Sequence, residues 1–242
     1  MRLDKLLAHM GIGSRKDIKK LCKEDRVLVN GSAVRDSGMI VHPYMDQIVV
    51  DGDRVKYREY IYLMMNKPQG VISATEDRKF KTVIDLLHPE HQNFQPFPVG
   101  RLDIDTEGFL LLTNDGQLAH HLLSPRKHVP KTYYAKIQGQ VTQTDVDSFA
   151  QGVVLEDGYH TLPGQLEIQK SDAESEILLT IYEGKFHQVK RMFAAVGKRV
   201  TFLKRIRFAS LPLDESLQLG EYRELTEQEL ASLTTENDEN IV

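Results

Sequence analysis

Three carboxylates and an arginine are concentrated in residues 100–108, Gly-Arg-Leu-Asp-Ile-Asp-Thr-Glu-Gly, between two apolar segments. A carboxylate this close to a buried strand can act as a nucleophile or as a general base. The alternating carboxylates also match the start of a calcium-binding loop, but Asn114 stands where that loop requires a bidentate glutamate. A loop held together by arginine–carboxylate pairs is the structural alternative. The stretch therefore predicts a reactive carboxylate and argues against a calcium site.

Basic residues gather in two segments of a chain whose formal net charge is −4. Residues 1–26 contain eight Lys and Arg against four Asp and Glu, and residues 184–213 contain eight Lys and Arg and no acid. Residues 214–242 contain nine acids against Arg223 alone. Local basic segments in an acidic chain are typical of a protein with an anionic partner, most often a nucleic acid. Two solvated basic faces are the structural alternative.

Length and composition exclude several classes of protein. The chain has 242 residues, 40% of them hydrophobic, which suits one or two compact domains and excludes a disordered or collagen-like chain. Its single cysteine cannot form an internal disulfide, and no apolar run is long enough for a membrane span or a signal peptide. We therefore expect a soluble cytoplasmic protein with no membrane partner. We also expect a monomer, because the sequence has no spare apolar face.

The first 55 residues have the pattern of two helices followed by a hairpin. Apolar residues at positions 3, 6, 7 and 10 predict an amphipathic helix. Ser14 and Asp17 have the spacing of a capping box, which predicts a second helix with Cys22 on its buried face. Residues 27–29 followed by Asn30-Gly31 predict a β-hairpin, and further short strands follow up to residue 50.

From residue 60 onward, apolar strand candidates alternate with turns. The candidates cover residues 61–65, 133–137, 177–182 and 200–208, and a short helix covers residues 189–196. Residues 109–113 are predicted to form a buried strand or a buried helix segment. In the last strand, simple alternation puts Arg205 and Arg207 on one face and Phe208 on the other. Strands outnumber helices and do not alternate regularly with them, which predicts an α+β fold with a mixed, largely antiparallel sheet flanked by helices. Residues 234–242 have the composition of a disordered acidic tail.

The N-terminal unit, residues 1–59, resembles an S-four-like RNA-binding domain. The resemblance rests on Arg2-Leu-Asp-Lys-Leu-Leu, on Ser14-Arg15 and on Val27-Leu-Val-Asn-Gly31. The chain departs from the family at Arg26, where glycine is frequent. Its cations are expected to hold RNA phosphates: Arg2, Lys5, Arg15, Lys16, Lys19, Lys20, Lys23 and Arg26.

Five sequence blocks follow one another over the rest of the chain. They are Asn66-Lys-Pro-Gln-Gly70; residues 100–108 followed by Thr113-Asn-Asp-Gly116; Ser124-Pro-Arg126 leading to Lys131-Thr-Tyr133; residues 183–197, Glu-Gly-Lys-Phe-His-Gln-Val-Lys-Arg-Met-Phe-Ala-Ala-Val-Gly; and Gly220-Glu-Tyr-Arg223. Together they resemble the ribosomal pseudouridine synthases, and more closely the A branch that acts on small-subunit (16S) rRNA. The resemblance covers nearly the whole chain and implies a catalytic domain over residues 60–233.

The resemblance implies an RNA-modifying isomerase whose catalytic residue is Asp103. Such an enzyme breaks the C1′–N1 bond of a uridine, turns the uracil and rejoins it through C5, so it needs no metal and no cofactor. Asp103 can act as nucleophile or as base, and the sequence leaves both roles open. The same resemblance assigns Lys190 as the cation beside Asp103. It assigns Arg101 to the space that the flipped base vacates and Tyr133 to stacking on the uracil.

Around this site, we expect Arg191, Arg205 and Arg207 to contact RNA phosphates. Apolar contacts to the uracil are expected from Leu178, Leu179 and Phe186. The implied partner is ribosomal RNA or a partly assembled small ribosomal subunit.

Three other functions stay open at this point. One is the same reaction on large-subunit (23S) rRNA, and another is a non-catalytic RNA-binding factor for ribosome assembly. The third is a glycosidase with paired carboxylates, against which the basic segments speak. The complete set of Arg101, Asp103, Tyr133 and Lys190 speaks against a factor that has lost its activity.

Overall fold

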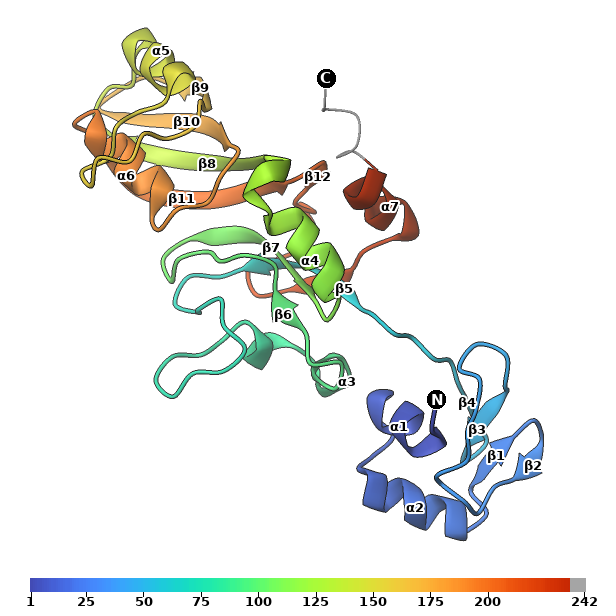
Figure 1. The fold of residues 1–242 in the computed structure, drawn as a ribbon. Coiled ribbons are helices and arrows are strands. Elements are labelled where there is room, and N and C mark those ends of the chain that lie inside the picture. The colour runs from blue at the N-terminus through green and yellow to red at the C-terminus, as the bar shows by residue number, and fades with distance from the viewer. Residues whose placement is uncertain (236–242) are drawn as a thin grey trace. The chain divides into compact units, whose positions relative to one another are not determined.

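The computed structural model describes residues 1–235, and contacts within the chain divide it into two units (Figure 1). The first unit contains residues 1–61 and 87–96, and the second contains residues 62–86 and the chain from residue 97 onward. The predicted acidic tail lies outside the described residues except for positions 234 and 235, which end the last helix. No helix of the described chain has the length and apolar character to cross a membrane.

The first unit packs two helices and a short third one with a four-stranded antiparallel sheet in the order β2-β1-β3-β4. Its elements are α1 (Leu3–His9), α2 (Arg15–Lys23), β1 (Val27–Val29), β2 (Ser32–Ala33), β3 (Ile48–Val50), β4 (Asp53–Val55) and α3 (Pro89–Gln92). The capping box of Ser14 and Asp17 starts α2, as predicted, and Cys22 is fully buried. The strand β4 was not predicted. The segment 87–96 belongs to this unit through Phe94, whose ring centroid lies 5.0 Å from that of His9.

The second unit is built on a nine-stranded sheet. Its elements are β5 (Tyr62–Lys67), η1 (Ile84–Leu86), β6 (Phe97–Pro98), β7 (Glu107–Thr113), α4 (Gly116–Leu123), η2 (Pro125–Lys127), β8 (Lys131–Gln138), α5 (Gln143–Gln151), β9 (Gln165–Lys170), β10 (Glu174–Ile181), α6 (Gln188–Ala195), β11 (Arg199–Phe208), β12 (Leu211–Pro212), β13 (Tyr222–Glu224) and α7 (Glu227–Thr235). Each of the four predicted strands and the predicted helix corresponds to one of them, and the buried segment at residues 109–113 forms a strand, β7.

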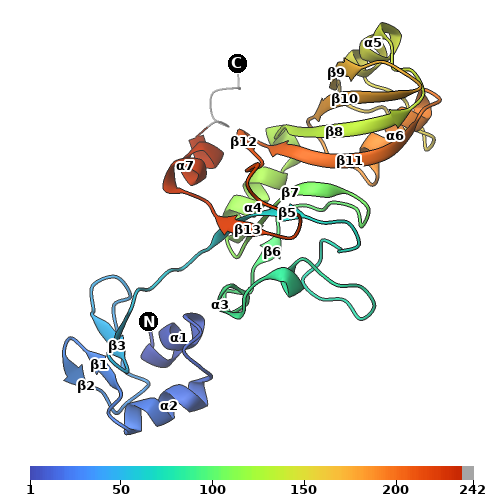
Figure 2. The ribbon, with the colours of Figure 1, turned by 180° about the vertical axis from the view of Figure 1, so that it is seen from behind.

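The main path of the sheet runs β13-β5-β7-β11-β8-β10-β9, with β6 paired to β7 and β12 to β11. Among these pairs, β7 and β11 run parallel and the others antiparallel, so the predicted α+β fold with a largely antiparallel sheet is confirmed. Figure 2 shows β13 at one edge of this sheet, beside β5. Strand β7 is buried along six consecutive positions because it lies in the interior of the sheet.

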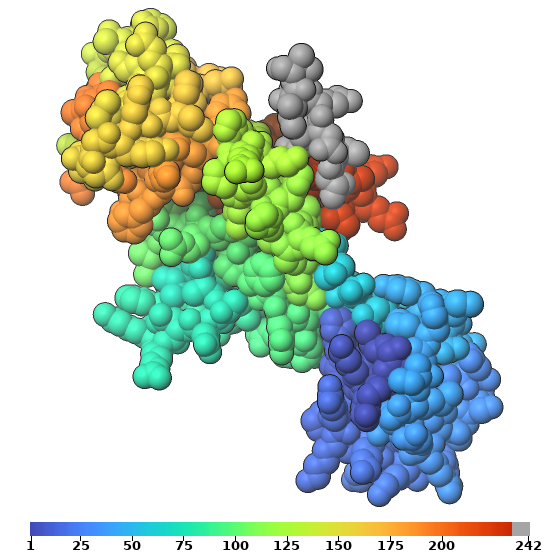
Figure 3. Space-filling model, in the orientation of Figure 1, coloured from blue at the N-terminus to red at the C-terminus, as the bar shows by residue number. Residues whose placement is uncertain are grey.

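Helices cover the sheet at two places. Leu118 and Leu122 of α4 pack on Met64 of β5 and Phe109 of β7. At the other end of the unit, α5 packs on β9 and α6 on β11, and the rings of Phe149 and Phe193 meet there at 4.9 Å. The space-filling view shows this end of the unit in yellow and orange (Figure 3).

Strand β11 does not follow the simple alternation that its sequence predicts. Its register against β8 shifts twice, once between Val200 and Phe202 and once between Arg205 and Arg207. A bulge of this kind adds a residue to one strand and moves the following side chains to the other face. Arg205 and Phe208 are therefore buried on one face, whereas Arg207 is exposed. The prediction that Arg205 and Arg207 share a face was wrong.

Candidate active site

The loop that carries Asp103 lies between β6 and β7, and hydrogen bonds from the end of β5 hold it in place. The ammonium of Lys67, the last residue of β5, donates hydrogen bonds to the carbonyl oxygens of Asp103 and Thr106, both at 2.9 Å, and of Pro68 at 3.1 Å. Ser73 Oγ bonds to both the carbonyl and the amide of Leu102. The backbone of the reactive loop is thus held on several sides.

Lys67 is fully buried. Burial lowers its pKa to about 8, although the nearby carboxylates of Asp103, Asp105 and Glu107 act in the opposite direction. No role for Lys67 was predicted from the sequence. Its position at the end of an apolar strand was the signal in the sequence for such a role, because a lysine buried there requires polar partners for its ammonium.

Asp103 meets Lys190 across the unit, as the sequence led us to expect. Lys190 Nζ lies 3.0 Å from Asp103 Oδ2 and 2.6 Å from Asp105 Oδ1. The lysine stands on the first turn of α6, and its side chain is 25% exposed. Burial works to lower the pKa of Lys190, but its bonds to Asp105 and Asp103 outweigh burial and raise it. Burial works to raise the pKa of Asp105, but the hydrogen bond from Lys190 Nζ outweighs burial and lowers it.

A histidine for which no role was predicted from the sequence, His187, also lies beside the carboxylate of Asp103. His187 Nε2 lies 3.6 Å from Asp103 Oδ1. His187 precedes α6 with a backbone φ of 48°, in the left-handed region, and its ring stacks on that of Phe186 at 3.7 Å. Asp103 therefore faces Lys190 on one oxygen and an imidazole on the other.

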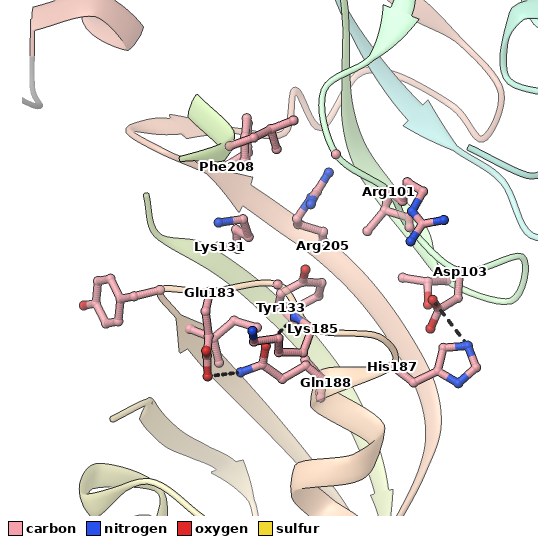
Figure 4. A pocket seen from close by; sticks show the side chains of 18 of the residues that line it. Arg101, Asp103, Lys131, Tyr133, Glu183, Lys185, His187, Gln188, Arg205 and Phe208 are labelled. Atoms are coloured by element: carbon pink, nitrogen blue, oxygen red, sulfur yellow. Dashed lines mark hydrogen bonds and ion pairs between the residues drawn. The ribbon is translucent and has the colours of Figure 1, made fainter. Parts of the chain in front are cut away.

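Asp103 borders a cavity of about 360 Å³, whose lining residues include Arg101, Tyr133 and His187 (Figure 4). Tyr133 is 8% exposed and sits on β8, so its ring forms part of the cavity wall. Arg101 is exposed and has no hydrogen bond or ion pair to another described residue. The structure thus brings together the four residues that the motifs singled out. A carboxylate beside two nitrogen groups and an aromatic wall can attack or deprotonate a substrate in the cavity.

The apolar part of the cavity differs from the expected one. Leu162, Ile181 and Leu203 line it, whereas Leu178, Leu179 and Phe186 do not. Phe186 is 70% exposed and Leu179 is fully buried. Leu179 lies on the same face of β10 as Ile181, two residues away, so alternation predicted its face but not how far the cavity extends along the strand.

The three arginines expected to hold phosphates differ in their surroundings. Arg207 is exposed and bonds to the carbonyl of Ser210. Arg191 is paired at 2.6 Å with both Glu156 and Asp157. Arg205 is 2% exposed and lines the cavity wall, so it does not belong to an exposed phosphate-binding surface. That part of the prediction is corrected, because the bulge in β11 turns Arg205 inward.

The cations of the first unit fall into two groups. Arg2 is paired with Asp4 at 2.7 Å and Arg26 with Asp51 at 2.6 Å, and Lys20 lies 3.9 Å from Glu24. The others are exposed and form no ion pair with a described residue: Lys5, Arg15, Lys16, Lys19 and Lys23. The second group, four of whose five members lie on α2, is the one available to an external anion.

Comparison with known proteins places these features in a family. Residues 61–195 match the family described as RNA pseudouridylate synthase, and residues 1–48 match the S4 domain. A crystal structure of a pseudouridylate synthase superposes with a TM-score of 0.68 at 35% identity, covering 96% of this chain and 99% of that one.

Full-length relatives carry related names. An uncharacterised RNA pseudouridine synthase of Bacillus subtilis is 55% identical over 95% of this chain and 97% of its own. The ribosomal large subunit pseudouridine synthase B of Bacillus subtilis is 42% identical, over 96% and 95%. The ribosomal small subunit pseudouridine synthase A of Escherichia coli is 40% identical, over 96% and 100%.

Proposed function

Because this chain belongs to the RNA pseudouridylate synthase family and begins with an S4 domain, we propose that it isomerises a uridine of ribosomal RNA to pseudouridine. The observation that carries the proposal is the carboxylate of Asp103, bonded to Lys190 at 3.0 Å, beside a cavity walled by Tyr133. The cavity of about 360 Å³ is in the range of small-molecule pockets and has room for one flipped base.

In the proposed reaction, Asp103 is the catalytic residue. It either attacks C1′ of the ribose or removes the C2′ proton, and the C1′–N1 bond breaks with its electron pair left on the uracil. The uracil turns and C5 bonds to C1′. In the first route the bond between C1′ and Asp103 breaks as this bond forms, and in the second route Asp103 returns the proton to C2′. The proton on C5 then leaves to solvent and N1 takes up a proton. Atoms and electrons therefore balance without an external reagent. The hydrogen bond from Lys190 Nζ to Oδ2 holds the carboxylate of Asp103 in place beside the cavity.

Three further roles belong to the same proposal. Tyr133 stacks on the uracil, and Arg101, which is exposed, occupies the space that the flipped nucleotide leaves in the RNA. Residues 1–59 hold the RNA through the exposed cations of α2, and residues 60–233 catalyse the reaction. Arg191 and Arg207 contact phosphates near the site once Arg191 exchanges its carboxylate partners for RNA.

The small-subunit RNA is the substrate we propose, free or in a partly assembled particle, with the protein acting as a monomer in the cytoplasm. A specific observation keeps large-subunit RNA as the second candidate. The relative named for the large subunit is 42% identical to this chain and the relative named for the small subunit is 40% identical, so overall similarity does not separate the two.

The test uses unmodified small- and large-subunit rRNA with tritium at uridine C5, each as free RNA and as partly assembled particles. Wild type releases tritium from the small-subunit preparations, and Asp103→Asn releases none while binding the RNA with unchanged affinity. Asp105→Asn is the matched control, because it removes a neighbouring carboxylate that also bonds Lys190, and it stays active. Release from the large subunit alone would change the proposed substrate. RNA binding without release from any preparation would refute the enzymatic proposal.

A further inference from the structure

Two cations, Arg205, which is buried, and Lys131, which is half-buried, line the wall of the cavity and face the same space. Lys131 stands on β8 two positions before Tyr133, so both side chains project from the same face of that strand. In the register of β8 with β11, Tyr133 pairs with Arg205 and Lys131 with Phe208. The bulge after Arg205 puts Arg205 and Phe208 on that face as well. Figure 4 shows Asp103 toward one end of the cavity and Lys131 toward the other, with Tyr133 and Arg205 between them.

Neither cation has a carboxylate partner among the described residues. The guanidinium of Arg205, which is 2% exposed, makes one hydrogen bond, from Nε to the carbonyl of Phe109 at 2.7 Å. Its Nη2 is buried and has no partner. Lys131 Nζ donates one hydrogen bond, to the carbonyl of Val129 at 2.7 Å. Both cations approach the ring of Phe208, Arg205 at 5.0 Å and Lys131 at 5.8 Å from its centroid.

Two like charges in this position are unfavourable unless an anion joins them. Burying a charge without a partner costs roughly several kcal/mol, even after the protein around it relaxes. Both acids that line the same cavity already have partners. Asp103 is bonded to Lys190, and Glu183 accepts hydrogen bonds from the hydroxyl of Tyr159, the amide of Leu162 and the side chain of Gln188. Burial and the charge of Arg205 lower the pKa of Lys131 to about 8, against the opposite effect of Glu183. The cavity wall is therefore suited to an anion that is present only transiently.

We propose that Lys131 and Arg205 form an anion site for the uracil itself, which binds a carbonyl oxygen of the base as negative charge develops on it. This inference rests on the proposed function. When the C1′–N1 bond breaks, the electron pair spreads from N1 onto O2 and O4, so the detached base is an anion until C5 bonds to C1′. A backbone phosphate is tied to the chain on both sides and stays near the surface, whereas the flipped base is the part of the RNA that enters a buried cavity.

Fixed cations at such a position act mainly in the transition state. They are already oriented by Phe109, Val129 and Phe208, so no reorganisation is needed when the charge appears. The neutral uracil of the bound substrate gains much less from them. Removing one of the two should slow bond cleavage by about 100-fold and leave RNA binding unchanged.

The experiment measures single-turnover tritium release and RNA affinity with whichever of the four rRNA preparations the wild type accepts. Lys131→Gln removes one charge, and Lys136→Gln is the matched control. Lys136 lies on the same strand and projects from the opposite face. We expect Lys131→Gln to lose about 100-fold in the single-turnover rate constant, with the RNA dissociation constant and its salt dependence unchanged, and Lys136→Gln to match wild type.

Two outcomes would overturn the inference alone. Lys131→Gln turning over as fast as Lys136→Gln would show that the charge is not used. An unchanged rate combined with weaker RNA binding and a salt slope reduced by about one would assign the site to a phosphate. If wild type accepts no preparation, the proposed function fails and this inference fails with it.

A second variant covers the case in which Lys131→Gln does not fold. Lys131→Arg keeps a cation that stays protonated across the working range, and the charged groups that face it are Arg205 and Glu183. We expect wild-type rates to fall as the pH rises through about 8, and the rates of Lys131→Arg to fall less, because only Lys67 loses its charge over this range in the variant. Identical alkaline limbs in the two proteins would contradict the inference.

Discussion

Replacement of Lys67 by methionine tests two opposing effects of its buried ammonium: the hydrogen bonds that it donates stabilise the fold, and the burial of its charge destabilises it. The substitution keeps a long unbranched side chain but removes three hydrogen bonds to the carbonyls of Pro68, Asp103 and Thr106. Bonds to charged groups contribute about 1.5–3 kcal/mol each, and burial of the charge offsets part of this. We expect Lys67→Met to be less stable than wild type at pH 7. We also expect it to lose at least about 100-fold in activity, because the backbone of Asp103 is released.

The pH dependence of stability gives the sharper test. The pKa of Lys67 is about 8 in the folded state against about 10.4 in an unfolded chain. Between these values the unfolded state binds more protons, so the free energy of unfolding rises with pH. Integrated from pH 7 to pH 10, one such lysine contributes an increase of about 2.5 kcal/mol. Lys131, whose pKa is also about 8, contributes a second increase that Lys67→Met retains.

Urea unfolding at pH 7, 8, 9 and 10, followed by circular dichroism, measures this difference. The free energy of unfolding of wild type should rise over this range by about 2.5 kcal/mol more than that of Lys67→Met. Lys136→Met serves as the control, since Lys136 is a half-buried lysine on β8 outside the cavity lining, and it should follow wild type. Parallel pH profiles for wild type and Lys67→Met would refute the assignment of a destabilised ammonium at this position.

Two further predictions concern the frame of the site and the RNA-binding surface. Gly108 has a φ of 101°, and an added Cβ would collide with the backbone of Arg205, so Gly108→Ala should cost about 3 kcal/mol or more in thermal unfolding. Gly116→Ala, at an open position, should change stability by less than about 1 kcal/mol, and equal effects would contradict this reasoning. Lys16→Gln should reduce the salt slope of RNA binding by about one, because Lys16 has no ion pair within residues 1–235. Arg26→Gln should reduce it less, because Arg26 is already paired with Asp51. Equal slopes for these two variants would argue against α2 as the contact surface.

Much of the secondary structure follows from local sequence. The strand at residues 109–113 is continuous in apolar character because β7 lies inside the sheet, and the capping box of Ser14 and Asp17 fixes the start of α2 through bonds within one turn. Such features depend on neighbours a few residues away, so a reading of the sequence reaches them. The order of the motif blocks identified the family by resemblance, and with it Asp103.

The site itself depended on contacts that the sequence does not encode locally. Lys190 reaches Asp103 from 87 residues away, and Lys67 anchors the same loop from a strand that reads as purely apolar up to its last residues. The motif gave the pairing of Asp103 with Lys190 only through the family resemblance. The distances, and the part played by His187, come from the packing of α6 against the sheet.

Composition and alternation determined the α+β class, the strands and the presence of basic segments, because these are local properties of the chain. Only the tertiary structure decided which cations are free. Arg26 is neutralised by Asp51 and Arg191 by Glu156 and Asp157, partners that lie 25 to 35 residues away. The bulge in β11 turned Arg205 from the surface into the cavity, because strand register is set by pairing with β8 and not by the sequence of β11 alone.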